Sequence, residues 1–185
     1  LMLAQRSEAE TIDALEIDEH AYEQCVANFE ASTWADRLFC YHAGLDEFVD
    51  EFDEKYDLIV SNPPFYSEDV SSGKPSRNVA RQNKSLPFVE LLESVSKLLE
   101  KAGVFAVIIP SKEEEIFVSL ASKADLFPRT ITRVKGNPTS VIKRSLMEFG
   151  FNEREVKIDE LIIETERHRY TQEYINLTQD FYLKM

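Results

Sequence analysis

Hydrophobic residues along the chain recur with two spacings, one typical of buried strands and one typical of amphipathic helices. Short apolar runs of strand length occur at Ile12–Glu16, Leu38–Tyr41, Asp57–Ser61 and Val104–Ile109. Helical spacing follows three of these runs, and the helices are expected to begin after Asp18, after Ser85 and at Glu113. Strands that alternate with helices predict βαβ units, so the sequence indicates an α/β fold with a mostly parallel sheet.

The predicted helices carry apolar stripes that mark their buried faces. The stripe of the first helix is formed by Tyr22, Cys25, Val26 and Phe29. The stripe of the second runs from Phe88 to Leu99, and we expect Gly103 to end that helix. A last helix is expected over Thr171–Lys184.

The end of the chain breaks the alternation of strands and helices. Strand-like segments occur near Ile131–Val134, Ser145–Phe149 and Glu160–Ile163 with no helical pattern between them. The C-terminal edge of the sheet should therefore turn antiparallel. The irregular stretch from Phe65 to Lys84 is long enough to suspect a functional loop.

The composition fits one folded domain over residues 1–185. With 43% hydrophobic and 30% charged residues, the chain can build a core. No apolar run is long enough to span a bilayer, which argues against a membrane protein. The two cysteines form no CxxC pair and the three histidines have no metal-ligand spacing, so we expect a reducing cytoplasm and no metal.

Charge is distributed unevenly. The net charge of −13 argues against indiscriminate nucleic-acid binding, but residues 1–57 hold 3 Lys+Arg against 16 Asp+Glu, whereas residues 58–185 hold 18 of each. Two stretches of the balanced part, 70–89 and 126–147, contain no acid. The first carries Lys74, Arg77, Arg81 and Lys84, and the second includes Arg144. One face could therefore bind a polyanion, although ordinary solvated loops are the alternative interpretation.

The tetrapeptide Asn62-Pro63-Pro64-Phe65 directly follows a predicted buried strand. In open α/β sheets, ligands bind beyond the carboxyl ends of the strands. The two prolines remove amide donors and leave carbonyl acceptors, Asn62 adds a side-chain acceptor, and Phe65 adds a flat aromatic face. Two acceptors beside an aromatic ring suit an exocyclic amine on a planar base. A rigid turn with Phe65 in the core is the alternative interpretation.

This tetrapeptide resembles the fourth motif of class I S-adenosylmethionine (SAM)-dependent methyltransferases that act on amino groups. The segments Tyr56–Tyr66, Pro75–Arg81 and Thr178–Leu183 are similar to those of bacterial tRNA(Val) adenine-N6-methyltransferases. The resemblance implies a Rossmann-like sandwich that uses SAM to methylate the N6 amino group of an adenine in tRNA, at adenosine 37. It assigns catalysis to Asn62, Pro63, Pro64 and Phe65.

The resemblance also implies the cofactor residues. Glu16 should accept hydrogen bonds from the cofactor ribose, and Ile17 should pack on its adenine; Asn62 also borders the cofactor. The family usually carries Asp after Ala at the third strand, where this chain has Gly44, so Leu45 or Asp46 is expected to replace that contact. The family's glycine-rich loop would precede Leu1, and we therefore expect a strand and this loop to be missing from the N-terminus of this chain.

Other functions remain open from the sequence alone. An enzyme with this motif could methylate guanine N2 of ribosomal RNA or a protein glutamine, and a non-catalytic RNA- or protein-binding relic is a third possibility. The two basic stretches count against the glutamine substrate, which needs no polyanion-binding surface, and Lys74, Arg77, Arg81, Lys84 and Arg144 are expected to contact a tRNA. The sequence gives no oligomeric state, and a monomer is assumed.

Overall fold

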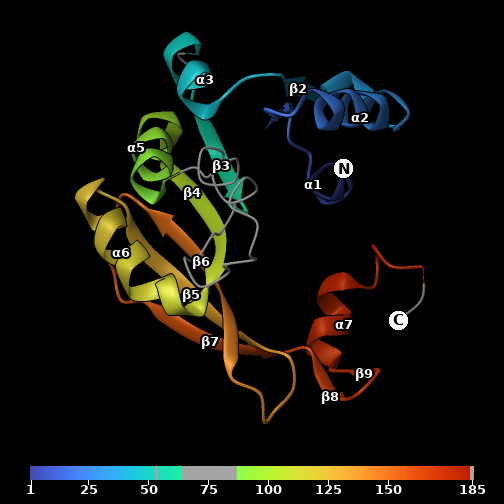
Figure 1. The fold of residues 1–185 in the computed structure, drawn as a ribbon, viewed down its shortest axis with the longest axis vertical. Helices are drawn as coiled ribbons and strands as arrows, with labels where there is room; N and C mark the ends of the chain where they lie inside the picture. Colours follow the sequence, from blue (N-terminus) through green and yellow to red (C-terminus); the bar gives the residue numbers. More distant parts are fainter. Residues whose placement is uncertain (53, 64–86, 184–185) are drawn as a thin grey trace, which may run out of the picture. The chain divides into compact units, whose positions relative to one another are not determined.

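A computed structural model describes residues 1–52, 54–63 and 87–183 of the chain (Figure 1). The stretch from Phe65 to Lys84, expected to be a functional loop, lies outside these residues. The chain divides into two compact units, Leu1–Asp53 and Glu54–Met185. Among the helices of the described residues, none has both the length and the apolar character needed to cross a bilayer.

The first unit is built around one βαβ motif. Its elements are α1 (Met2–Arg6), β1 (Ile12–Leu15), α2 (Glu19–Glu30), β2 (Leu38–Tyr41) and α3 (Leu45–Glu51). β1 and β2 pair in parallel, with Ile12 opposite Leu38. Asp18 caps α2 as expected, because its Oδ1 accepts a hydrogen bond from the Ala21 amide at 3.1 Å.

The second unit contains a five-stranded sheet. Its main elements are β3 (Tyr56–Ser61), α5 (Phe88–Leu98), β4 (Leu99–Pro110), α6 (Glu114–Lys123), β5 (Phe127–Lys135), β6 (Ile142–Gly150) and β7 (Lys157–Ile162). The strand order is β3-β4-β6-β5-β7, and within this sheet β6 alone runs against its neighbours. A small β8 (Glu164–Glu166) and β9 (Arg169–Tyr170) precede the last helix, α7 (Gln172–Thr178). The predicted α/β class and the antiparallel turn near the C-terminus are both confirmed.

The core of the second unit lies between this sheet and the helices α5 and α6 (Figure 1). Phe105, Phe117 and Phe149 are fully buried, and the Phe117 ring lies 5.7 Å from that of Phe149. β4 alternates buried and half-buried residues from Val104 onwards, so every second side chain points into this core.

Two predicted helix ends are wrong. α5 ends at Leu98 rather than at Gly103, because Leu99 already pairs with Tyr56 as the first residue of β4. α7 ends at Thr178, well before Lys184. In addition, α3 was not expected; it buries Phe48, whose ring stacks on that of Phe52 at 4.1 Å.

Candidate functional site

Asn62 and Pro63 come directly after the last residue of β3. Ser61 pairs in parallel with Val107 of β4, so both strands point their carboxyl ends toward the same edge of the sheet. Asn62 is exposed at this edge and Pro63 is buried. Pro64 and Phe65 lie outside the described residues. The first half of the tetrapeptide is therefore placed where open α/β sheets bind their ligands.

Arg144 lies at the same edge of the same sheet. Because β6 runs antiparallel, its first residues lie beside the end of β4, and Arg144 is paired with Pro110. The Arg144 side chain is exposed. The other cations expected to contact tRNA lie outside the described residues: Lys74, Arg77, Arg81 and Lys84.

In the first unit, Glu16 and Ile17 follow the carboxyl end of β1. The Glu16 amide donates to the Tyr41 carbonyl at 3.1 Å, which extends the pairing with β2 by one residue. Glu16 Oε1 accepts a hydrogen bond from the Asp18 amide at 2.9 Å, so the carboxylate is held at the turn into α2. Ile17 is 55% exposed, and its carbonyl lies 3.3 Å from His42 Nε2. An exposed apolar residue thus lies next to a fixed carboxylate.

Leu45 and Asp46 begin α3, just after β2. Gly44 is the N-cap residue, and its amide donates to Glu47 Oε2 at 3.1 Å. The Asp46 carboxylate folds back over Gly44, because Asp46 Oδ1 lies 2.6 Å from the position that a Cβ at residue 44 would take. Asp46 therefore occupies the space in which an Asp side chain at residue 44 would begin.

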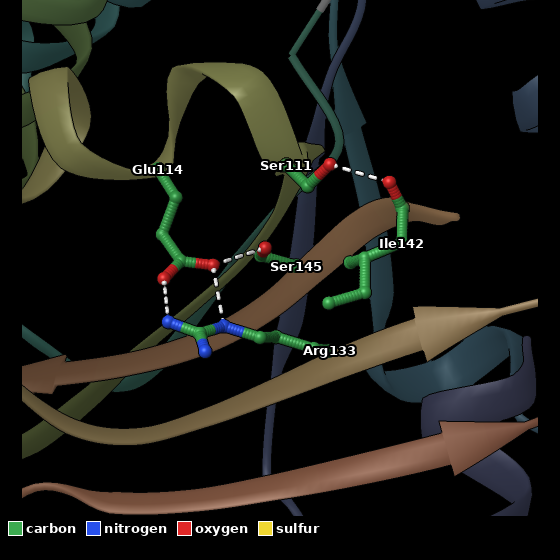
Figure 2. A network of polar contacts seen from close by, with 5 residues as sticks. All are labelled: Ser111, Glu114, Arg133, Ile142 and Ser145. Atoms are coloured by element: carbon green, nitrogen blue, oxygen red, sulfur yellow. Dashed lines mark hydrogen bonds and ion pairs between the residues drawn. The ribbon is translucent and has the colours of Figure 1, made fainter.

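A buried polar network lies beside the end of β4 and was not predicted (Figure 2). Glu114 lies at the start of α6, and its Oε1 accepts a hydrogen bond from Arg133 Nη2 at 2.8 Å. The other carboxylate oxygen of Glu114, Oε2, accepts from Ser145 Oγ at 2.5 Å. Ser111 Oγ donates to the Ile142 carbonyl at 2.8 Å. Together these contacts tie the turn after β4 to strands β5 and β6.

The electrostatics of this network favour an ionised Glu114. The hydrogen bond from Arg133 lowers the pKa of Glu114 from its ordinary value, although burial of the carboxyl group acts in the opposite direction. The same hydrogen bond raises the pKa of Arg133. A pocket of about 430 Å³ opens beside the pair, lined by Ser111, Lys112, Glu114, Glu115, Arg133 and Ile142. The sequence carries no local signal for this network, because its members are brought together from α6, β5 and β6.

The cysteines and acidic residues of the described part of the chain form neither an activated thiol at Cys40 nor a cluster that could hold a metal. Burial raises the pKa of the Cys40 thiol to about 12, and Cys25 beside it acts in the same direction, so Cys40 stays protonated at neutral pH. The described residues contain no group of three or more His, Cys, Asp or Glu side chains that could hold a metal ion.

Comparison with known proteins identifies the family. The model of the Eco57I restriction-modification methylase family matches residues 2–115. A tRNA1(Val) (adenine(37)-N6)-methyltransferase of Flavobacterium johnsoniae is 61% identical over 186 residues, covering 100% of this chain and 79% of that protein. This chain belongs to that methyltransferase family. A relative with the same name from Christiangramia forsetii is 57% identical, and the alignment covers 100% of this chain and 78% of the relative.

Solved structures of methyltransferases share the fold of this chain. A predicted O-methyltransferase from Agrobacterium tumefaciens superposes with a TM-score of 0.70 at 17% identity, covering 96% of this chain and 81% of that one. A methyltransferase from Pyrococcus furiosus gives a TM-score of 0.53 at 23% identity, covering 80% of this chain and 68% of that one. At these identities the likeness concerns the fold alone, and it agrees with the class I methyltransferase sandwich that the sequence predicts.

Proposed function

We propose that this chain transfers the methyl group of SAM to the N6 amino group of adenine 37 in tRNA1(Val), as one methyltransferase domain over residues 1–185. The observation that carries this proposal is the position of Asn62 and Pro63 immediately beyond the carboxyl end of β3. Relatives of the same name align with the whole chain, which supports the substrate. Because such a substrate is a cytoplasmic RNA, we infer a cytoplasmic location.

The residues at the ends of β1 and β2 fit a nucleoside cofactor. Glu16 Oε1 is already held by the Asp18 amide, which orients the carboxylate to accept hydrogen bonds from a ribose diol. Ile17 offers an exposed apolar side chain to an adenine ring. Leu45 and Asp46 follow β2, and the folded-back Asp46 carboxylate can accept from an adenine amino group. When bound, SAM supplies an electrophilic methyl group on a sulfonium sulfur.

Asn62 and Pro63 prepare the amine that receives the methyl group. The Asn62 Oδ1 and the Pro63 carbonyl accept hydrogen bonds from the adenine NH2, which favours a pyramidal nitrogen with its lone pair free to attack. These acceptors also stabilise the positive charge that develops on nitrogen as the new N–C bond forms. Phe65 stacks on the target base. After transfer, the nitrogen loses its proton to water, so no adjacent general base is required.

Methylation of a defined tRNA by the full-length protein tests the proposal. We expect tRNA1(Val) to gain N6-methyladenosine at position 37, measured by mass spectrometry of the digested RNA. Asn62→Ala should lower kcat by about 10²–10³-fold while the protein still folds and binds SAM, because the change removes one preorganised acceptor. Asn152→Ala, a change in the exposed turn after β6, is the matched control and should keep full activity. Absence of methylation by the parent protein would refute the function, and full turnover by Asn62→Ala would refute the assigned residue.

A further inference from the structure

The tip of the β5–β6 hairpin, defined here as residues 136–144, is held by its own hydrogen bonds and carries an exposed apolar side chain. Asn137 Oδ1 accepts hydrogen bonds from the amide and hydroxyl of Thr139, at 3.1 and 2.9 Å. The Ser140 amide and hydroxyl both donate to the Asn137 carbonyl, at 3.1 and 2.9 Å. Despite these bonds, Val141 is 74% exposed. The tip thus presents one apolar side chain from a hydrogen-bonded loop, and what it could contact depends on the charges and the site around it.

The hairpin tip lies at the edge of the sheet that carries Asn62. Lys135 pairs with Ile142, and Pro110 pairs with Arg144, so the tip extends past the end of β4 (Figure 1). The hydrogen bond from Ser111 Oγ to the Ile142 carbonyl fixes the stem of the hairpin to the turn after β4 (Figure 2). The tip and the edge that carries Asn62 therefore belong to one hydrogen-bonded sheet.

The charge at the tip is positive on the β6 side. Lys143 and Arg144 are both exposed, and no acid occurs between Leu126 and Met147. Acids lie on both sides of the tip: Glu160 of β7 forms an ion pair with Lys135 at 2.7 Å, and Glu114 and Glu115 line the pocket beside Ile142 of β6. Because Glu160 and Glu114 are each paired with a cation of β5, Lys143 and Arg144 are the exposed charges of β6 that an anionic partner would meet at the tip.

We propose that the hairpin tip binds the tRNA beside the target adenine. Lys143 and Arg144 contact phosphates, and Val141 packs against the base or ribose of a nucleotide next to the extruded one. A base can reach Asn62 only if it leaves its stack, which exposes the apolar faces of its neighbours, and apolar side chains commonly cover such faces. This inference rests on the proposed tRNA substrate.

The test compares charge and apolar variants of the full-length protein. Binding of tRNA1(Val) and the KM for this tRNA are measured for Lys143→Glu, Val141→Ser and the control Lys101→Glu. Lys101 is exposed near the start of β4, at the opposite edge of the sheet, and its variant makes the same change in net charge. SAM affinity and circular dichroism show that each variant is folded.

The proposal predicts a different result for each variant. Lys143→Glu should weaken tRNA binding ~10-fold and lower the slope of log affinity against log salt by about one. Val141→Ser should weaken binding several-fold with an unchanged salt slope, because it removes no charge. Lys101→Glu should match the parent. If the parent methylates tRNA but the first two variants bind and turn over like Lys101→Glu, the hairpin proposal fails while the proposed function stands. A change in oligomeric state with unchanged tRNA binding would also overturn it, by making the tip a self-association surface.

Discussion

The two units differ sharply in charge. Leu1–Asp53 carries 2 Lys+Arg against 14 Asp+Glu, whereas Glu54–Met185 carries 19 against 20. Four candidate cofactor residues, Glu16, Ile17, Leu45 and Asp46, lie in the acidic unit, whereas Asn62 and the candidate tRNA residues lie in the balanced one. A sulfonium cofactor is positively charged and RNA is a polyanion, so the acidic unit would favour the first and repel the second, whereas the balanced unit would repel RNA far less. Because the two sets of candidate residues differ in this way, mutations should be able to weaken SAM binding and tRNA binding separately.

The two units also differ in how they are held together. The five-stranded sheet has a core of fully buried side chains, including Phe105, Phe117 and Phe149. In the first unit, Arg37 contributes much of the order, because its guanidinium donates to the carbonyls of Ala4, Ser7 and Ala9 at 2.6–3.0 Å. The edge that carries Asn62 is thus built on a packed sheet, while the turn before β1 is held by hydrogen bonds.

The largest expected effect is on the RNA side. Changing Arg77, Arg81 and Lys84 together to Glu should abolish tRNA binding and keep SAM affinity, because three expected phosphate contacts would become repulsive. The slope of log affinity against log salt should fall by about two to three units. Lys97, Lys101 and Lys123 are exposed near the amino edge of the sheet, and changing them to Glu gives a charge-matched control. Filter binding over a salt series measures both proteins. If the two triple variants bind tRNA with equal affinity and equal salt slope, the assignment of tRNA binding to these three cations is wrong.

A smaller effect is expected on the cofactor side. Glu16→Ala should weaken SAM binding by about 1–3 kcal/mol, since the ribose hydroxyls would lose their acceptor. The tRNA salt slope should not change, because Glu16 belongs to the acidic unit. Isothermal titration calorimetry measures the affinity, and Glu30→Ala, an exposed change at the end of α2, serves as control. An unchanged SAM affinity would remove Glu16 from the cofactor site.

The smallest effect is on stability. Glu114→Gln should destabilise the protein by about 1–2 kcal/mol at pH 7, because it removes the charge paired with Arg133. The folded state lowers the pKa of Glu114 below its ordinary value of 4.5, so its contribution is complete above pH 4.5 and is lost as the pH falls through the lowered value. Urea unfolding at pH 7 and in strong acid should therefore show a difference between parent and variant that shrinks in acid. A pH-independent difference would show that Glu114 acts through packing alone.

Local patterns predicted most elements of the fold, and they were wrong where two patterns overlap. β2 matches its predicted bounds because its apolar run is short and isolated. Leu99 continues the helical spacing of α5, so the sequence could not show that this residue already belongs to β4. α3 was missed because it has only 7 residues. Glu47, three positions after Gly44, and the Phe48/Phe52 pair are the signals that could have revealed it.

The site was predictable only in part. Asn62 could be placed because a motif at a strand end has a fixed position in the sheet, and Arg144 joins it through the pairing of β6 with β4. The Glu114–Arg133–Ser145 network could not be foreseen, because it depends on how three distant segments pack. Likewise, the position of the Asp46 carboxylate over Gly44 is set by side-chain conformation, which spacing does not encode.

The insertion of β6 between β4 and β5 has a consequence for folding during synthesis. β4 is complete at Pro110, but β6, which pairs with the edge of β4 opposite β3, begins only at Ile142. Until the ribosome has made β6, the edge of β4 exposes unpaired backbone groups, as any edge strand does. Pairing across this sequence separation closes a long loop, which slows folding. The edge on which Asn62 lies should therefore reach its final form late, once the last strands of the sheet have been synthesised.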